Sequence, residues 1–228
     1  PPLAWTWWLG LSSPEVPHFF WGNSPTGRVR DLMTETRVYT RRGDDGTTGL
    51  LYGGRVAKDS PAPMAYGDVD EAQAAIGLAR AASGPEMGAI LVGLERDLWL
   101  VMAELACNPE KIVQLGESGS RPTPDMVTAL EDLIDDVADR FEPPTEFVAP
   151  GEDEVSARLD VARTVCRRAE RSALSASVEG SSVVPYLNRL SDLLWTLARW
   201  QEADSAEGGS LTVRSIEGRS IEGLSTPD

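Results

Sequence analysis

The feature that most constrains the fold is a set of long segments in which apolar residues recur every three or four positions. The clearest segment covers about 86–107, where six aliphatic side chains fall on one helical face: Ile90, Leu91, Leu94, Leu98, Val101 and Leu105. That spacing is typical of an amphipathic helix whose apolar stripe packs against a core. A strand repeats every two residues and could not gather these side chains on one face.

Similar patterns elsewhere predict five helices in all, over about 68–83, 86–107, 124–141, 152–178 and 182–203. Breaks separate them, because Gly84-Pro85 follows the first and Pro143-Pro144 stops the third. A β-prone stretch, 37–40, and a glycine-rich loop, 43–54, precede the first helix. Long helices joined by short loops predict an all-α fold, specifically a ferritin-like up-down five-helix bundle.

The two ends differ from this middle region, so we expect the folded domain to cover 37–203. Residues 1–36 carry four tryptophans without any period. The chain begins with proline, and Met33 is a more natural start, so we expect a disordered or non-native N-terminal extension. A signal peptide is not favoured, because nothing basic precedes the short apolar stretch. Residues 204–228 are rich in Ser and Gly, which predicts a flexible tail.

Composition excludes several kinds of function. With 21 Lys and Arg against 36 Asp and Glu, the formal net charge is −15. Such a charge disfavours nucleic acid and anionic membranes as partners. The single histidine, His18, leaves the folded domain without a Ser-His-Asp triad or a multi-histidine metal site. Two cysteines, Cys107 and Cys166, make no disulfide framework; we expect two small core residues in a cytoplasmic, reducing compartment.

A first candidate binding segment is the glycine-rich stretch that runs from Thr40 to Asp59. It combines many glycines with the hydroxyls of Thr47 and Thr48 and with basic side chains, including that of Lys58. Glycines let the backbone approach a ligand closely and present N–H groups, so a polyphosphate cradle is one interpretation. The alternative is a β-hairpin turn with surface charges. The segment is not a Walker A loop, because GxxxxGK[ST] is absent.

A second candidate lies on the fourth predicted helix, where Arg163, Arg167 and Arg171 share one stripe about 12 Å long. Guanidinium groups suit phosphate oxygens, so this stripe predicts an anion site. The alternative is a solvated face with salt bridges. We expect partial cover, because apolar positions adjoin the stripe. On the fifth helix, Asn188 and Arg189 could contact a nucleobase or ribose, or form an interhelix hydrogen bond.

Two further groups of residues each allow two interpretations. Asp68, Asp70 and Glu71 open the first predicted helix, where acids complement the helix dipole. Alternatively, Asp70 is a buried partner for an arginine of the fourth helix. Three tryptophans lie on helical stripes and favour core positions over a ligand platform: Trp99, Trp195 and Trp200.

Taken in order, these segments resemble the PduO-type ATP:cob(I)alamin adenosyltransferases over about 37–203. The matching stretches are Tyr39–Thr48, Arg55–Asp59, Tyr66–Glu71, Phe147–Gly151, Ala162–Arg171 and Leu187–Asp192. Three positions depart from the usual pattern: Ala72 replaces a leucine, Glu152 replaces a second glycine, and Cys107-Asn108 precedes Pro109 where the family more often has threonine.

The resemblance implies a homotrimer of five-helix bundles with active sites between subunits. It implies transfer of the 5′-deoxyadenosyl group of ATP to cob(I)alamin, giving adenosylcobalamin and triphosphate. Mg²⁺ would be held mainly by the ATP phosphates. A reductase and an adenosylcobalamin-dependent mutase are candidate partners. The ATP residues carried over are Thr40, Arg41, Arg42, Gly43, Asp44, Thr48, Gly49, Lys58, Arg167, Arg168, Glu170, Arg171 and Asn188.

The resemblance also implies a division of labour in the reaction. Co(I) is itself a strong nucleophile, so orientation and electrostatics suffice and no protein base is needed. Phe147 would fill the lower face of the corrin and exclude a lower ligand, while an Asp70–Arg163 pair would hold the surrounding elements. The candidate cobalamin contacts are therefore Asp70, Phe147 and Arg163. The candidate catalytic residues are these same three together with Arg167.

Two other functions remain open from the sequence. One is a carrier that binds adenosylcobalamin and delivers it to a dependent mutase. The other is a structural or regulatory bundle that senses nucleotide. The intact glycine-rich loop and arginine stripe favour the enzyme, because a carrier does not need a triphosphate site.

Overall fold

The computed structural model describes residues 39, 41–145 and 147–205. The predicted extension 1–36 and the tail beyond Ser205 lie outside the described residues, as do Thr40 and most of the predicted strand 37–40.

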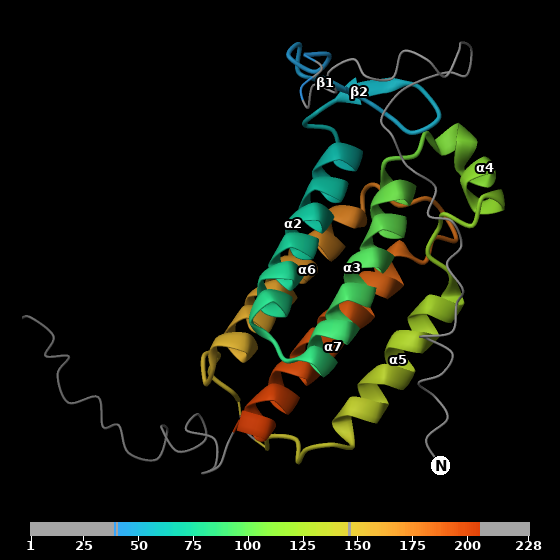
Figure 1. Ribbon diagram of the computed structural model, residues 1–228. Coiled ribbons are helices and arrows are strands. Elements are labelled where there is room, and N and C mark those ends of the chain that lie inside the picture. Colours follow the sequence, from blue (N-terminus) through green and yellow to red (C-terminus); the bar gives the residue numbers. More distant parts are fainter. Residues whose placement is uncertain (1–38, 40, 146, 206–228) are drawn as a thin grey trace, which may run out of the picture. The chain divides into compact units, whose positions relative to one another are not determined.

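The described chain is a helical bundle, as predicted, and each of the five predicted helices has a counterpart. These are α2 (Pro61–Ala82), α3 (Pro85–Leu105), α5 (Pro124–Ala138), α6 (Glu154–Ala173) and α7 (Val183–Ser205). Successive helices run in alternating directions (Figure 1). Helix α2 packs against α3 and α6, and α7 packs against α6 and α5.

The segment between α3 and α5 contains more regular structure than the predicted loop. A 3₁₀ turn, η1 (Pro109–Lys111), leads directly into a sixth, short helix, α4 (Ile112–Glu117). Six residues are too few to show the helical period clearly, so the sequence pattern missed α4.

Helix α2 begins at Pro61, seven residues before the predicted start. Pro61 and Pro63 lie in its first turn, where proline is tolerated because backbone N–H groups there lack intrahelical partners. The first turn of α2 carries no acidic residue. Asp68, Asp70 and Glu71 therefore lie inside the helix, and their interpretation as dipole-complementing residues is wrong.

The start of α6 is fixed by a capping box. The Asp153 side chain accepts hydrogen bonds from the backbone N–H groups of Val155 at 2.7 Å and Ser156 at 2.8 Å. In return, the Ser156 hydroxyl accepts from the Asp153 backbone N–H at 3.3 Å. This reciprocal arrangement satisfies N–H groups that a helix start otherwise leaves unpaired.

The core lies between the apolar faces of α2, α3, α6 and α7, with α5 covering part of it. Cys107 and Cys166 are buried, as predicted. Two tryptophans contradict the prediction of core positions, because Trp99 is 53% exposed and Trp195 is 36% exposed. Periodicity indicates a face of a helix, and it does not tell whether that face is covered within one chain. None of the described helices combines the length and apolarity needed to cross a membrane.

Candidate active site

The glycine-rich segment forms a hairpin of two short antiparallel strands, β1 (Thr47–Gly49) and β2 (Arg55–Ala57). Asp45 Oδ1 accepts hydrogen bonds from the Thr47 hydroxyl at 2.8 Å and the Thr47 N–H at 3.0 Å. These bonds, with the hydroxyl contributing most, hold the pKa of the Asp45 carboxyl below its ordinary value. Arg55 donates to the Thr47 hydroxyl and to the Arg42 carbonyl. The hairpin alternative is thus confirmed, and it does not exclude a phosphate cradle.

Lys58 lies beside the turn that precedes β1. A Cβ placed on Gly43 would be 3.0 Å from Lys58 Nζ, so only glycine lets the lysine approach this closely. The turn is closed by Gly46 N–H donating to the Gly43 carbonyl at 3.2 Å, and Lys58 N–H donates to the Gly46 carbonyl at 2.9 Å. The structure therefore brings together two residues that the sequence predicted for ATP, Gly43 and Lys58.

The predicted arginine stripe is present on α6. Arg167 and Arg171 are exposed, and Arg171 donates to the backbone carbonyl of Arg167 at 2.9 Å. Arg163 is more enclosed, with 26% of its side chain exposed. The arginine stripe was expected to be partly covered, and within one chain only Arg163 meets that expectation.

Arg168 faces another way and contacts α2. Its guanidinium forms salt bridges with Glu71 and, at 3.4 Å, with Asp68. Hydrogen bonding to Glu71 is the main cause that raises the pKa of Arg168. The Ser172 hydroxyl also donates to Asp68. These contacts join α2 to α6, so within the chain Arg168 holds the two helices together.

Glu170 and Asn188, both predicted for ATP, contact each other across α6 and α7. Asn188 Nδ2 donates to Glu170 Oε1 at 3.0 Å, so the amide is oriented by the carboxylate. Nearby, the Cys166 thiol donates to the Leu187 carbonyl at 3.3 Å. Burial raises the pKa of Cys166 to about 12, which keeps it a neutral thiol and agrees with its predicted role in the core.

A cavity of about 360 Å³ is lined by Phe147 and Arg163, two of the residues predicted to contact the corrin. Phe147 is 97% exposed, and its ring is an unusually large apolar surface to leave in water. Three other residues of this cavity were not predicted for a binding site: Asp160, Arg199 and Trp195, which was expected in the core. One signal could have found them, since Arg199 interrupts the apolar stripe of α7 one turn after Trp195.

Behind the cavity lies a buried charge network. Arg199 Nη2 contacts Asp160 Oδ2 at 2.7 Å and Glu202 Oε1 at 2.9 Å, and all three side chains are nearly inaccessible. Asp160 uses its other oxygen, Oδ1, to accept from Arg163 Nε at 3.0 Å. Asp160 is thus shared by two guanidinium groups, those of Arg163 and Arg199, and both of these residues line the cavity. Burial raises the pKa of Glu202, and the Arg199 charge opposes that shift.

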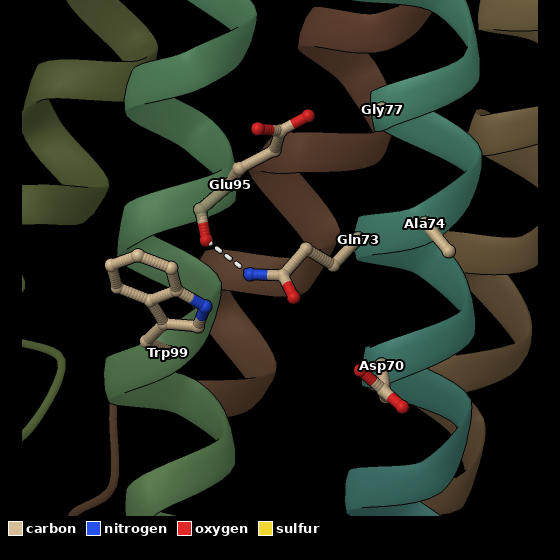
Figure 2. A pocket seen from close by; sticks show the side chains of 6 residues that line it. All are labelled: Asp70, Gln73, Ala74, Gly77, Glu95 and Trp99. Atoms are coloured by element: carbon tan, nitrogen blue, oxygen red, sulfur yellow. Dashed lines mark hydrogen bonds between the residues drawn. The ribbon is translucent and has the colours of Figure 1, made fainter. Parts of the chain in front are cut away.

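Asp70 lies elsewhere, in a shallow cavity of about 270 Å³ between α2 and α3. Figure 2 shows Gln73 reaching from α2 to the Glu95 carbonyl, at 2.5 Å, with Trp99 alongside. Asp70 is exposed, whereas Arg163 pairs with Asp160. The prediction that Asp70 is a buried partner of an α6 arginine is therefore wrong within a single chain, because the two side chains line different cavities.

Over the described residues, no group of three or more His, Cys, Asp or Glu side chains could hold a metal ion.

Comparisons with known proteins connect these features. The sequence profile of the Cobalamin adenosyltransferase family matches residues 38–201. The corrinoid adenosyltransferase of Mycobacterium tuberculosis H37Rv is 42% identical over 180 residues, covering 74% of this chain and 90% of that protein. The corrinoid adenosyltransferase PduO of Citrobacter freundii is 40% identical over 172 residues, covering 74% of this chain. The chain spans 50% of the length of that PduO protein and 56% of that of its Salmonella typhimurium relative.

A solved structure agrees with the fold. A variant PduO-type ATP:corrinoid adenosyltransferase from Lactobacillus reuteri, complexed with cobalamin and ATP, superposes with a TM-score of 0.64. It is 26% identical and covers 73% of this chain and 91% of that one. The ordered motifs, the helical bundle, the family profile and these relatives lead to one conclusion: the chain belongs to the cobalamin adenosyltransferase family.

Proposed function

We propose that this chain transfers the 5′-deoxyadenosyl group of ATP to cob(I)alamin. In this reaction the cobalt electron pair forms a Co–C5′ bond, the C5′–O bond breaks, and triphosphate leaves. Family membership supports the proposal, as do relatives described as corrinoid adenosyltransferases and the Lactobacillus reuteri structure with cobalamin and ATP.

The observation that carries the proposal is that one face of α6 connects two kinds of binding surface. Arg163 lines the cavity that contains Phe147. Arg167 and Arg171 follow at four-residue intervals, roughly 6 and 12 Å further along the helix axis. A cavity lined by aromatic and proline side chains as well as by paired charges therefore adjoins a row of cations, which is the arrangement that a corrin and a triphosphate would need to react with each other.

In this proposal, the hairpin and the exposed arginines bind ATP. Arg167 and Arg171 would stabilise the negative charge of the leaving triphosphate, where fixed cations contribute most to rate. Lys58, with the backbone of Gly43 and Thr48, would hold the phosphates or ribose from the hairpin side. The carried-over roles of Thr40, Arg41, Arg42, Asp44 and Gly49 remain part of the proposal. Mg²⁺ would enter with the phosphates as MgATP.

The cavity end would bind the corrin. Phe147 is exposed and apolar, so a corrin face placed against it would remove it from water and exclude water or a lower ligand from that face. The opposed charges of Asp160 and Arg163 are already paired with each other. The cavity wall therefore needs no charged group from the ligand.

We also propose a homotrimer with active sites between subunits. Phe147 and the side chains of Arg167 and Arg171 are exposed in the single chain, which leaves the site open on one side. Asp70 and Arg163 lie at different cavities, so a pair between them would have to join neighbouring subunits. As partners we propose a reductase that supplies cob(I)alamin and an adenosylcobalamin-dependent mutase that uses the product.

The decisive experiment is an anaerobic absorbance trace of the protein with cob(I)alamin and MgATP. Loss of the cob(I)alamin band, appearance of a light-sensitive alkylcobalamin and release of triphosphate in equal amounts would establish the reaction. A protein that binds adenosylcobalamin tightly but forms none would be a carrier. A protein that binds MgATP without any corrin would be a nucleotide sensor.

Phe147→Ala separates the two substrates. We expect an unchanged Kd for MgATP and adenosylation from cob(II)alamin plus reductant slowed about 10- to 100-fold, the effect of losing one buried aromatic contact. Val113→Ala is the matched control, because Val113 is also apolar and 70% exposed but lies on α4. If Phe147→Ala weakened MgATP binding as much as the corrin step, the assignment of Phe147 would be wrong.

A further inference from the structure

The tip of the β1–β2 hairpin is attached to the C-terminal end of α3. Leu51 N–H donates to the Ala106 carbonyl at 2.8 Å, and Asn108 N–H donates to the Leu51 carbonyl at 3.0 Å. These two bonds form a parallel bridge between Leu51 and Cys107. The hairpin, which continues from β2 towards α2, is therefore also held at its opposite end.

The Asn108 side chain reinforces this attachment through both of its polar atoms. Its Nδ2 donates to the Gly53 carbonyl at 3.2 Å. Its Oδ1 accepts from the Glu110 N–H at 3.1 Å, which caps the start of η1. One amide thus joins the hairpin tip to the segment that leaves α3.

The hairpin needs support from outside its own strands. Each strand has only three residues, and an isolated two-stranded hairpin is marginally stable in water. Its tip contains three consecutive residues with positive φ: Tyr52 at 62°, Gly53 at 99° and Gly54 at 93°. A tyrosine in the left-handed region is strained, and such a conformation persists only where the surroundings impose it.

The surface to which the tip is attached is itself firmly held. Cys107 is 4% exposed, and Glu104, one turn earlier, is 5% exposed. Glu104 accepts two hydrogen bonds from Arg121, at 2.9 and 3.0 Å, in a bidentate pair. This pair ties the end of α3 to the chain after α4, so the bridge at Leu51 has a fixed support.

We propose that Asn108 is a positioning residue for ATP, which holds the hairpin in its nucleotide-binding arrangement before the nucleotide arrives. The inference rests on the proposed function, because it takes Thr48 and Gly49 of β1 as nucleotide contacts. A loop that is ordered in advance loses less conformational freedom on binding, so its ligand binds more tightly.

Asn108→Ser tests the side chain with little else changed. Serine remains a good cap for η1, but it cannot donate to the Gly53 carbonyl. We expect the Kd and KM for MgATP to rise about three- to tenfold, the effect of one lost hydrogen bond. The kcat at saturating ATP, the KM for cob(I)alamin and the Tm should stay at wild-type values. Asn108→Ala should raise the KM for MgATP equally and also lower the Tm, because it removes the cap.

Amide hydrogen exchange gives a second measurement that does not depend on activity. In the absence of nucleotide, Asn108→Ser should speed exchange at Leu50, Leu51 and Gly53, and saturating MgATP should restore protection. Gln114→Ser, which removes an exposed amide from α4, should change neither exchange nor MgATP affinity.

Three results would overturn the assignment. An unchanged Kd for MgATP in Asn108→Ser, with normal binding by the wild type, would overturn it alone. Equal losses of affinity for MgATP and for corrin would show a general structural role instead. Failure of the wild-type protein to bind MgATP at all would overturn the proposed function, and this assignment with it.

Discussion

The hairpin end and the cavity end of the proposed site are built in opposite ways. At the hairpin end, short strands and exposed cations predominate, and Lys58, Arg167 and Arg171 lie at the surface. At the cavity end, the guanidinium of Arg199 is buried against carboxylates that balance its charge. The difference indicates which ligand suits each end. Exposed cations favour a polyphosphate, whereas a wall whose charges are paired with one another suits the uncharged face of a corrin.

The strongest test of this comparison is to remove one arginine from each end and measure stability. Arg199→Met should lower the free energy of unfolding by about 3–5 kcal/mol, because it leaves Asp160 and Glu202 buried with one cation fewer. Urea unfolding monitored by circular dichroism would measure the loss.

Arg55→Met is the matched change in the hairpin, where the arginine side chain is 46% exposed and contacts Asp45 at 3.6 Å. We expect it to cost less than about 1 kcal/mol, as exposed ion pairs usually do. Equal losses in the two variants would contradict the distinction between a self-neutralised end and an open one.

Enzymatic activity should depend more on the exposed arginines than on stability-determining ones, which is the reverse of the order expected for unfolding free energy. Arg167→Met removes an exposed cation from the proposed triphosphate site, and we expect kcat/KM for MgATP to fall about 10²–10³-fold, with little change in unfolding free energy. Arg96→Met, an exposed arginine on α3, serves as control and should leave kcat/KM unchanged. If Arg167→Met retained full activity, the stripe would be a solvated surface and the triphosphate would have to bind elsewhere.

The features that the sequence could predict are those that depend on residues close together in the chain. The bundle follows from local periodicity, and the α6 stripe follows from spacing along one helix, so both are visible without a structure. The glycine-rich hairpin is also local, since Asp45, Thr47 and Arg55 are close in sequence. Helix ends were harder to predict, because prolines that usually break helices are compatible with the first turn of α2.

The buried network depends on contacts between distant segments, and for that reason it was missed. Asp160 on α6 meets Arg199 on α7 only after the bundle has folded. Nothing in the spacing of either helix specifies which acid faces which base. The exposure of Trp99 and Trp195 was missed for a related reason, since an apolar stripe on the surface of the bundle looks the same in sequence as a stripe that faces the core.

A smaller effect is expected from the protonation of one buried carboxyl in the bundle, that of Asp97. Burial raises the pKa of Asp97 from 3.8 to about 6, although the hydroxyl of Tyr186, which donates to it at 2.9 Å, lowers that pKa. A raised pKa means that the folded state favours the protonated carboxyl. This contribution to stability is fully present below about pH 4 and is lost as the pH rises through 6.

Asp97→Asn should therefore unfold like the wild type near pH 4 and be about 1–3 kcal/mol more stable at pH 8, because asparagine can still accept from Tyr186 but never ionises. Asp97→Ala leaves the Tyr186 hydroxyl without this acceptor and should be less stable than Asp97→Asn at every pH. A stability difference between wild type and Asp97→Asn that did not change with pH would contradict the assigned titration.

Asp45, at the hairpin, should titrate in the opposite direction and with the smallest effect. Its two hydrogen bonds from Thr47 favour the ionised carboxylate, so their contribution to stability is present above the unfolded-state pKa and is lost as the pH falls through the lower folded value. A ¹³C NMR titration of the carboxyl groups should give a midpoint below 3.8 for Asp45. Thr47→Val removes the hydroxyl donor but keeps the N–H, so the midpoint should move upwards. A midpoint for Asp45 that did not respond to Thr47→Val would contradict the Thr47 hydroxyl as the main cause of the lowered pKa.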